Sequence, residues 1–330
     1  MKLIKKTDLI FVAGHTGMVG SAIRRILEKN GYLNLLLPSR EELDLSDFLS
    51  VKKWFNKYKP DIVILAAAKV GGIQANYQYP GDFILENLKI QTNVIENSWI
   101  NEVKRFIFLG SSCIYPKFAP QPIKEKYLLS GKLELTNEPY AISKIAGIKL
   151  CSSLKKQYGF DAISLMPTNL YGPRDNYHSL NSHVLPSLIR KFYDAKINMK
   201  SEVRCWGSGS PRREFLYVDD LAEAVLFTIE NISSDNDLLY EKDAELSGIL
   251  NVGVGKDISI KELACLISKE TNYEGEITWD LSKPDGTPRK VLDTSKLNKL
   301  GWEPKIRINE GIKITINHFL SELENNSIRI

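Results

Sequence analysis

The sequence predicts an α/β protein, with a Rossmann-type, doubly wound parallel sheet and a smaller mixed α/β substrate domain. Short apolar segments typical of strands alternate with segments of helical periodicity through the first half of the chain. Later the alternation gives way to a helix, polar loops and short strands. We therefore expect a larger domain over 1–174 and a smaller one over 175–213 and 241–304, with 214–240 and 305–322 packing back on the larger domain.

The elements of the larger domain follow each other as strand, helix, strand. Each expected strand is a short apolar run, and each expected helix repeats its apolar residues at three- and four-residue spacing. The expected strands are DLIFVAG (8–14), NLLLPSR (34–40), DIVILAAA (61–68), RFIFLGSS (105–112) and AISLMPTNLYGP (162–173). The expected helices lie within 21–31, 50–60, 82–103 and 140–159.

The composition excludes several classes of protein. The net charge of +4 is spread over the chain without a long basic run, so nucleic acid is not an expected partner. No stretch approaches the roughly 18 apolar residues of a membrane span, and the N-terminal apolar run does not fit a signal peptide. The cysteines lack metal-site or disulfide spacing, so we expect no metal. Together these features favour the cytoplasm.

A glycine-rich turn, GHTGMVG, lies between the first strand and the first helix. Small residues at GxxGxxG spacing let backbone N–H groups and the helix N-terminus approach a pyrophosphate. The glycines alone would also fit a structural turn, but the strand–turn–helix context favours a dinucleotide. We assign the whole turn to cofactor binding: Gly14, His15, Thr16, Gly17, Met18, Val19 and Gly20.

The residues after the second strand favour NADP over NAD. An acidic residue there would bind the ribose 2′-hydroxyl of NAD, but the sequence has Ser39 and Arg40. A guanidinium suits a 2′-phosphate. The alternative is that Arg40 is an ordinary solvated arginine.

Tyr140 and Lys144, in the segment NEPYAISK, lie four residues apart and thus on one face of a helix that Pro139 can begin. We expect the ammonium to lower the pKa of the phenol from about 10, so that Tyr140 exchanges a proton with a substrate oxygen as hydride moves. Ser111, after the preceding strand, can hold the same oxygen. A lone YxxxK is more often a surface pair, but its place after a dinucleotide turn favours catalysis.

Cys113 lies two residues beyond Ser111, at the carboxyl end of a predicted parallel strand, where open α/β sheets bind ligands. Free cysteines are commonly small buried hydrophobes, and from the residues alone both packing and chemistry stay open for Cys113. For His183, a packed or surface histidine is the default interpretation. The other three cysteines are expected to be buried: Cys151, Cys205 and Cys265.

These residues resemble the extended short-chain dehydrogenase/reductase family, whose members rework nucleotide-activated sugars. Within it, nearly the whole chain looks like the GDP-sugar 3,5-epimerase/4-reductases. The strings SSCIYPK and SKPDGTPRK are more specific than the generic reductase motifs. The similar segments are AAKVGGI (67–73), LGSSCIYPK (109–117), NEPYAISKIAGIKLC (137–151), MPTNLYGP (166–173), NSHVLPSLIRKF (181–192), CWGSGSPRREFLYVDD (205–220) and SKPDGTPRKVLD (282–293).

The resemblance implies an NADPH-binding larger domain, a GDP-sugar-binding smaller domain and a homodimer. It assigns Cys113 and His183 to C3/C5 epimerisation of GDP-4-keto-6-deoxy-D-mannose, and Ser111, Tyr140 and Lys144 to reduction at C4. Further cofactor contacts fall on Leu109, Gly110, Lys144, Pro167, Asn169, Leu170 and His183. Substrate contacts fall on Arg190 or, preferably, Lys191, and on Trp206, Arg213 and Asp285.

Thr16 departs from this pattern, because some bacterial members carry an arginine there that helps to hold the 2′-phosphate. The preference for NADP therefore depends more heavily on Arg40, and use of NAD stays open.

The expected chemistry explains these residue types. Removing hydrogen from C3 or C5 of a 4-keto sugar gives an enolate, whose C4 oxygen Ser111 and Tyr140 can stabilise. Inversion needs an acid and a base on opposite faces of the ring, and a thiol and an imidazole both titrate near neutral pH. From the family we expect Cys113 to take the proton and His183 to return one.

Other activities known on this fold call for different residues. A 4,6-dehydratase needs carboxyl groups near Ser111, where this chain has Cys113 and Ile114. A 4-epimerase prefers an acidic residue in place of Arg40. No rule from the residues separates the related enzymes that form GDP-L-colitose or a GDP-6-deoxy-heptose. A non-catalytic NADP-binding regulator is less favoured, because such proteins usually lose the tyrosine or the lysine.

Overall fold

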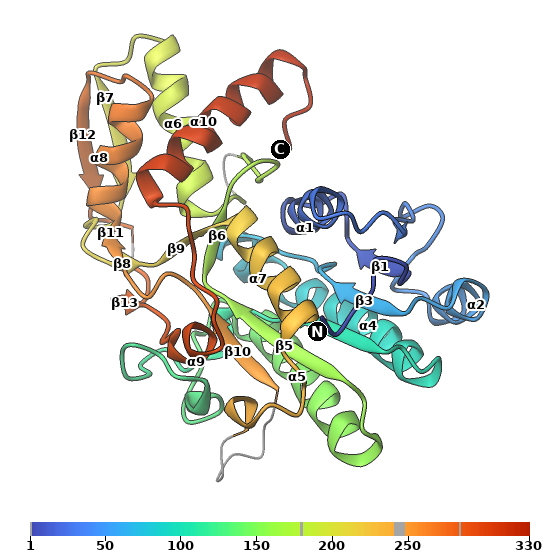
Figure 1. The fold of residues 1–330 in the computed structure, drawn as a ribbon. Coiled ribbons are helices and arrows are strands. Elements are labelled where there is room, and N and C mark those ends of the chain that lie inside the picture. The colour runs from blue at the N-terminus through green and yellow to red at the C-terminus, as the bar shows by residue number, and fades with distance from the viewer. Residues whose placement is uncertain (1, 179–180, 241–247, 284) are drawn as a thin grey trace.

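The computed structural model describes residues 2–178, 181–240, 248–283 and 285–330. Its centre is a six-stranded sheet in the order β10-β5-β4-β3-β1-β2, and every strand pair in it is parallel (Figure 1). The predicted doubly wound fold is thereby confirmed. The strands are β1 (Ile10–Ala13), β2 (Leu35–Leu36), β3 (Ile62–Leu65), β4 (Arg105–Leu109), β5 (Ala162–Pro167) and β10 (Ile249–Val252).

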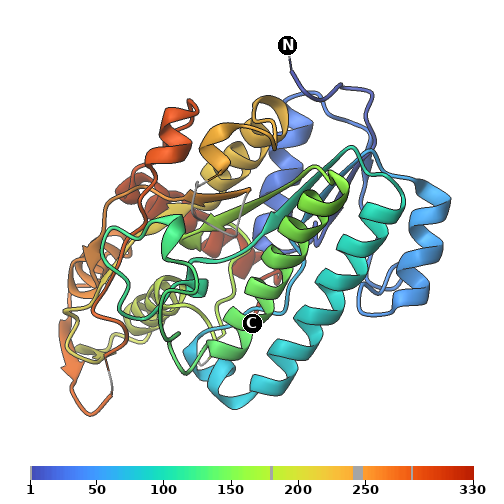
Figure 2. The ribbon, with the colours of Figure 1, turned by 90° about the horizontal axis from the view of Figure 1, so that it is seen from below.

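Helices cover both faces of this sheet because alternate strand residues point to opposite sides. Ile10 and Val12 belong to a core shared with α1 (Met18–Lys29) and α7 (Val218–Asn231). Phe11 belongs to the opposite core, where its ring centroid lies 4.4 Å from that of Trp54. That face carries α2 (Phe48–Tyr58), α4 (Pro80–Ile100) and α5 (Glu138–Tyr158), and Figure 2 shows α4 and α5 running side by side.

The expected strands at 34–40 and 162–173 are shorter than predicted. In the first, Ser39 starts a turn instead, in which its N–H donates to Glu42 and its hydroxyl accepts from the Glu42 N–H. In the second, Thr168 separates β5 from β6 (Asn169–Tyr171), which pairs with β9 (Phe215–Tyr217) outside the central sheet. Leu37 continues the apolar run beyond the end of β2, so the pattern does not reveal that first break.

The smaller part of the molecule is built from short strands and three main helices, and it lies at the upper left of Figure 1. Strands β11, β8 and β13 form one sheet, and β12 and β7 form another. Its elements are α6 (Val184–Ile197), β7 (Glu202–Trp206), β8 (Arg212–Arg213), β11 (Ile258–Ser259), α8 (Ile260–Glu270), β12 (Glu276–Asp280), β13 (Arg289–Lys290) and α10 (Ile308–Glu324). Two short helices, α3 (Ile73–Gln78) and α9 (Ser295–Lys299), lie in connections.

Of the two segments expected to pack back on the larger domain, the first does so and most of the second does not. Helix α7 packs against α1, beside the central sheet. Helix α10 packs against α8, and its Phe319 lies in the core of the smaller part. Only the start of the second segment reaches α7, where the N–H groups of Lys305 and Ile306 donate to Asp220. The two-domain division itself stays a prediction, and residues 241–247 lie outside the described residues.

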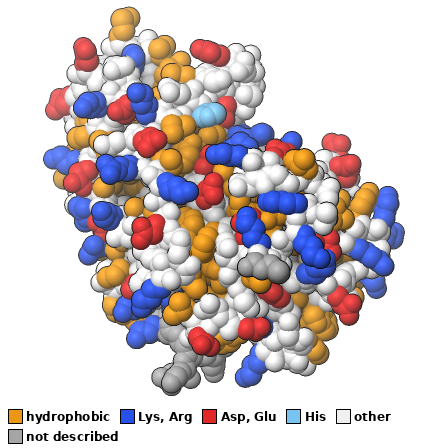
Figure 3. Space-filling view, viewed as in Figure 1, with side chains coloured by type: hydrophobic (Ala, Val, Ile, Leu, Met, Phe, Trp, Pro, Cys, Tyr) orange, Lys and Arg blue, Asp and Glu red, His pale blue; other side chains and the backbone are white. Residues whose placement is uncertain are grey.

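Within the described part of the chain, no helix is long and apolar enough to cross a membrane. The same residues contain no group of three or more His, Cys, Asp or Glu side chains arranged to hold a metal ion. Figure 3 shows basic and acidic side chains interspersed over the visible face rather than gathered into one basic patch.

Candidate active site

The parallel register brings the carboxyl ends of the central strands to one edge of the sheet. Ala13 lies opposite Leu65, Leu65 opposite Phe108, and Leu109 opposite Leu165. The glycine turn, the segment after β4 and the end of β5 therefore meet at this edge. This is where ligands bind in open α/β sheets.

The glycine turn closes tightly on its neighbours. Gly14 has a φ of +86°, and a Cβ there would lie 2.8 Å from the backbone of Ala67. A Cβ on Gly20 would overlap the Gly14 carbonyl oxygen at 2.1 Å. Gly17 is the N-cap of α1. Because glycine has no side chain to accept a hydrogen bond, the N–H groups of the first turn have no capping side chain. The turn thus fits a dinucleotide diphosphate.

The other expected cofactor residues follow the same edge. His15 and Thr16 lie within the turn, and Met18 and Val19 begin α1. Gly110 follows β4, where a Cβ would overlap the Met166 sulfur at 2.4 Å. The remaining members are Leu109 at the end of β4, Pro167 at the end of β5, and Asn169 and Leu170 in β6.

Arg40 lies beyond β2, the strand next to β1, and its side chain is exposed. Its guanidinium is close enough to contribute to the lowered pKa of Asp44, although hydrogen bonds from Ser46 are the larger cause. The arginine is therefore available to a ligand at the second strand.

Ser111, Cys113 and Tyr140 come together beyond the end of β4. The Ser111 hydroxyl accepts a hydrogen bond from the Cys113 N–H at 3.2 Å, because Ser111 is the N-cap of a short 3₁₀ turn over Ser112–Ile114. Burial raises the pKa of Tyr140, the charge of Cys113 adds to this, and a hydrogen bond with Ser111 opposes it. The thiol, the hydroxyl and the phenol thus form one cluster.

Lys144 lies one turn beyond Tyr140 on α5, which carries Pro139 in its first turn as predicted. Its Nζ donates to the Leu109 carbonyl oxygen at 2.9 Å and lies 6.0 Å from the centroid of the Tyr140 ring. Burial lowers the pKa of Lys144 to about 8. The expected lowering of the pKa of Tyr140 is wrong for this structure, because burial of the phenol outweighs the other effects.

His183 is the N-cap of α6, and its side chain is exposed. The protein around it nevertheless displaces enough water to lower the pKa of the imidazole. The preceding segment is held by the turn after β3, since the Gly72 N–H donates to the Asn181 carbonyl at 2.9 Å. A Cβ on Gly72 would lie 2.6 Å from the Ser182 carbonyl oxygen.

Trp206 and Lys191 form the outer part of the expected substrate site. The indole of Trp206 is 54% exposed, at the end of β7. The ammonium groups of Lys191 and Lys283 lie 5.6 and 5.5 Å from the centroid of its ring. Arg190 instead pairs with Asp194 on its own helix at 2.9 Å, so of the two neighbouring cations on α6 it is Lys191 that lies beside Trp206.

Arg213 lies close enough to interact with both Cys113 and Asp285. Arg213 donates to the Arg212 carbonyl at 2.8 Å and to the Thr287 carbonyl. Burial lowers its pKa, and the charges of Cys113 and Asp285 oppose this change. Asp285 accepts hydrogen bonds from the Ser208 N–H and hydroxyl at 2.9 and 2.7 Å. It thereby connects the loop after β7 to the segment before β13.

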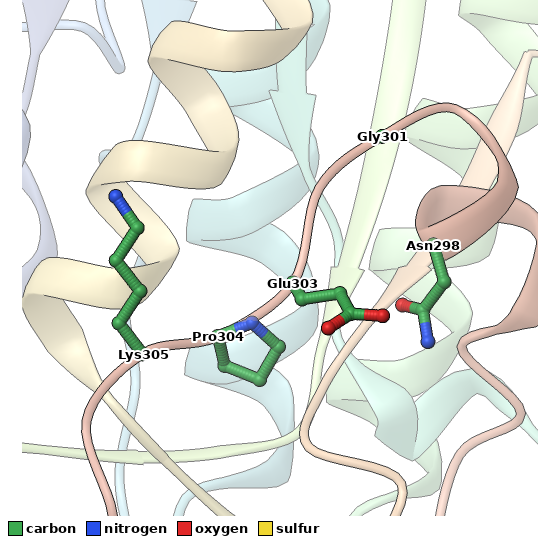
Figure 4. Close-up of a pocket in the computed structure, with 5 residues that line it drawn as sticks. All are labelled: Asn298, Gly301, Glu303, Pro304 and Lys305. Atoms are coloured by element: carbon green, nitrogen blue, oxygen red, sulfur yellow. The ribbon is translucent and has the colours of Figure 1, made fainter.

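A small pocket opens at Cys113. It is lined by residues of both parts of the molecule: Cys113, Tyr115, Pro116, Lys117, Ile123, Glu134, Asn137, Thr287 and Lys290. A separate depression beside α9 is lined by Asn298, Gly301, Glu303, Pro304 and Lys305, shown in Figure 4. It contains none of the expected site residues.

Residues 10–253 match the model of the family described as "NAD dependent epimerase/dehydratase family". The chain belongs to this family. The resemblance to extended short-chain dehydrogenase/reductases is thereby confirmed.

Relatives within the family are closely similar over nearly the whole chain. A protein named GDP-L-fucose synthase 1, from Arabidopsis thaliana, is 53% identical over 97% of this chain and 95% of its own length. The GDP-L-fucose synthase of Escherichia coli K12 is 51% identical over 94% of this chain and 96% of its own length.

Solved structures of the family share the fold. A GDP-L-fucose synthetase from Naegleria fowleri, bound to NADP, has a TM-score of 0.87 and 29% identity, covering 99% of this chain and 98% of that one. A GDP-6-OMe-4-keto-L-xylo-heptose reductase from C. jejuni has a TM-score of 0.90 and 37% identity, covering 97% of this chain and 99% of that one.

Two residues that contact the candidate site were missed by sequence reasoning. Gly72 and Lys290 both lie in segments that carry the family resemblance, AAKVGGI and SKPDGTPRKVLD, but neither residue type indicated a role. Their contacts, to Ser182 and to Cys113, join positions more than 100 residues apart in the chain. Cys265, expected to be buried, is exposed, because it lies on the outer face of α8.

Proposed function

We propose that the chain converts GDP-4-keto-6-deoxy-D-mannose to GDP-L-fucose, by epimerisation at C3 and C5 followed by NADPH-dependent reduction of the C4 ketone. The observation that carries this proposal is a thiol, Cys113, placed beside the Ser111–Tyr140 pair at the edge of the sheet. A simple ketone reductase has no need of that thiol. The names of the relatives at 51–53% identity agree with the proposal.

Epimerisation requires an acid and a base on the two faces of the sugar ring. We assign Cys113 as the base that takes a proton from C3 or C5, and His183 as the acid that returns one from the other side. The C4 oxygen becomes negative in the enolate, and the hydroxyls of Ser111 and Tyr140 are placed to donate hydrogen bonds to it. Desolvation lowers the pKa of His183, so a minority of the imidazole is protonated at neutral pH, and that protonated form is the acid that donates.

Reduction uses Tyr140 as the acid. Its raised pKa keeps the phenol protonated, the form that can give a proton to the alkoxide forming at C4. The ammonium of Lys144, 6.0 Å from the ring, then stabilises the phenolate left behind. NADPH, when bound, supplies the hydride.

NADPH binding is assigned to the turn around Gly14, Gly17 and Gly20, where the open N-terminus of α1 suits the diphosphate. Arg40 is assigned to the 2′-phosphate. The NADP-bound relative from Naegleria fowleri is consistent with this cofactor.

The GDP-sugar is assigned to residues of the smaller part. Lys191 and Arg213 supply cations for a diphosphate, and the exposed indole of Trp206 offers a surface against which a base can stack. Asp285 holds the loop that carries Ser208 beside Trp206.

Related GDP-sugars form the second candidate. The solved heptose reductase, at 37% identity, is consistent with a GDP-heptose as the alternative. A GDP-L-colitose synthase from Yersinia pseudotuberculosis, also 37% identical, is consistent with GDP-L-colitose. The higher identity to the GDP-L-fucose synthases favours GDP-L-fucose.

We also infer a cytoplasmic homodimer. The four cysteines are free, as expected in a reducing compartment. Leu85 on α4 and Ile142 on α5 are exposed apolar side chains that a second copy can cover.

The test is a comparison of substrates. The purified protein is incubated with NADPH and GDP-4-keto-6-deoxy-D-mannose, or with the 3-deoxy or heptose counterpart, while NADPH absorbance is followed and the sugar product is identified. We expect fastest oxidation with the first substrate and GDP-L-fucose as product. Faster turnover of either counterpart would replace this assignment with the second candidate.

A further inference from the structure

Lys290 reaches the sulfur of Cys113 from the other part of the molecule. The Lys290 Nζ lies 3.5 Å from the Cys113 Sγ, and the two residues are 177 positions apart in the chain. Within the described part of the chain, the Lys290 ammonium donates its hydrogen bond to Cys113. Lys290 is half-buried, so its charge is only partly screened by water.

The backbone around Lys290 is fixed on both sides. Strand β13 pairs with β8 so that Lys290 lies opposite Arg213. The Val291 N–H donates to the Gln121 side chain at 2.9 Å, and the Leu292 N–H donates to the Glu214 carboxylate at 2.8 Å. The ammonium is therefore carried to the thiol by an ordered segment.

Glu214 is the centre of this support. Its buried carboxylate accepts hydrogen bonds from the N–H groups of Val254, Gly255 and Leu292. It thereby ties the loop after β10, in the central sheet, to the segment that follows Lys290.

The charges around Cys113 favour an anion there. Lys290 from β13 is in contact with the sulfur, and Arg213 from β8 is close enough for the thiolate to stabilise its positive charge. Tyr140 from α5 faces the thiol as a neutral phenol. Lys117 and Glu134 line the same pocket, but the Glu134 carboxylate is occupied by hydrogen bonds from Thr136 and Asn137.

We propose that Lys290 is a positioning residue for epimerisation, whose ammonium contacts the Cys113 sulfur and stabilises the negative charge on that sulfur when it acts as the base. The thiolate takes the proton from C3 or C5, which leaves a thiol and an enolate, and the ammonium keeps its own protons throughout. Lys290 therefore acts on the epimerisation and has no part in the later hydride transfer. This inference rests on the proposed function for its substrate, but the contact with Cys113 stands by itself.

Alkylation of Cys113 tests the contact without any substrate. The full-length protein is treated with iodoacetamide between pH 5 and 10, and modification of the Cys113 peptide is followed by mass spectrometry. The unsubstituted protein is compared with Lys290→Met, which removes the charge, and Lys290→Arg, which keeps it. Lys117→Met serves as the matched control, because it removes a charge from the same pocket but not from the sulfur. The exposed Cys265 is an internal control in every sample.

A contacting positive charge stabilises a thiolate relative to a thiol, and the thiolate is the form that iodoacetamide alkylates. We therefore expect Lys290→Met to slow Cys113 alkylation about tenfold at pH 7 and to move the midpoint of its pH profile upward. In Lys290→Arg and Lys117→Met, the rate of Cys113 alkylation should stay within about threefold of the rate in the unsubstituted protein. Cys265 should react equally in all of them. An unchanged Cys113 profile in Lys290→Met overturns the proposal.

A second measurement separates epimerisation from reduction. In D₂O, Lys290→Met should slow deuterium entry into GDP-4-keto-6-deoxy-D-mannose about tenfold, while reduction of the pre-epimerised GDP-4-keto-6-deoxy-L-galactose stays within about twofold. A raised KM with normal alkylation would make Lys290 a substrate ligand instead and would overturn the proposal. If the unsubstituted protein turns over neither sugar, the proposed function fails, whereas the alkylation result still decides on the contact.

Discussion

Burial controls the protonation of the residues at the site. Tyr140 is held as a neutral phenol, and the buried Lys144 has a pKa lowered to about 8. The structure thus favours proton donation from the tyrosine at neutral pH, while its lysine is still mostly charged. Reduction, which needs an acid at C4, suits this arrangement better than oxidation does.

The pH dependence of reduction follows from Lys144. Its ammonium loses a proton as the pH rises through about 8, so the rate of the reduction step should fall above that pH. Between the folded pKa and the unfolded value near 10.4, the unfolded chain binds more protons, so this group makes stability increase with pH. The measurement is single-turnover oxidation of NADPH with the pre-epimerised ketone, alongside a thermal melt. A rate that stays flat up to pH 9.5 would exclude control by Lys144.

Cys113→Ser should separate the two steps. A serine hydroxyl is too weak a base at neutral pH, so we expect deuterium entry at C3 and C5 to fall by about 10²-fold or more. Reduction of the pre-epimerised ketone should remain. Cys265→Ser changes an exposed thiol on α8 and is the control. Its deuterium entry should equal that of the unsubstituted protein. Normal deuterium entry in Cys113→Ser removes the thiol from the mechanism.

Arg40→Ala should change cofactor preference. A charge-assisted hydrogen bond contributes about 1.5–3 kcal/mol, so NADPH affinity should drop roughly tenfold to a hundredfold, whereas NADH affinity should change little. Titration of both cofactors by fluorescence measures the two constants. Lys53→Ala, a nearby cation on α2, is the charge-matched control. Equal weakening of both cofactors would argue against a contact with the 2′-phosphate.

At the scale of elements, the site depends on turns that bring strand ends and helix starts into contact. The turn after β3 does this without side chains, because Gly72 lies against the carbonyl oxygen of Ser182 just before His183. The φ of Gly72 is −68°, which any residue can adopt. A larger residue there would therefore clash with the neighbouring backbone without straining its own backbone.

Gly72→Ala should therefore displace the segment that ends at His183. Overpacking of this kind costs about 1–3 kcal/mol, and a displaced catalytic group can lose up to about a hundredfold in rate. We expect slower deuterium entry with a modest decrease in thermal stability. Gly81→Ala is the matched control, since a Cβ there meets nothing within 4 Å. Equal activity in both variants would show that the turn does not position His183.

Elements that depend on local pattern could be predicted from the sequence, and those that depend on distant contacts could not. The apolar run at β1, the glycines after it and the start of α5 at Pro139 all carry local signals. The ending of β2 at Leu36 and the packing of α10 on α8 are decided by tertiary neighbours. The contact between Lys290 and Cys113 has no local signal, because both residue types have ordinary surface and core roles.

At the scale of the whole molecule, the proposed site draws on two parts of the chain. The central sheet presents the glycine turn, Ser111, Cys113 and Tyr140 at its carboxyl edge. The smaller part adds cations and Trp206, and the buried carboxylate of Glu214 ties the two together. A nucleotide-sugar bridging both parts is the substrate class that this arrangement fits.

A homodimer through α4 and α5 makes a separate prediction. Leu85→Arg would place a charge on the exposed apolar face, so we expect the mass measured by light scattering to halve while the circular dichroism spectrum is kept. Leu33→Arg, at an exposed leucine before β2, is the control and should leave the mass unchanged. A monomer in the unsubstituted protein would refute the proposed dimer.

The central claim is that one site performs both epimerisation and reduction, and a reaction in D₂O with GDP-4-keto-6-deoxy-D-mannose and NADPH tests it most directly. The account predicts GDP-L-fucose carrying deuterium at both C3 and C5, with one NADPH consumed for each sugar. A reduced sugar that keeps the D configuration and carries no deuterium at C3 and C5 would contradict it, because the protein would then be a ketone reductase alone.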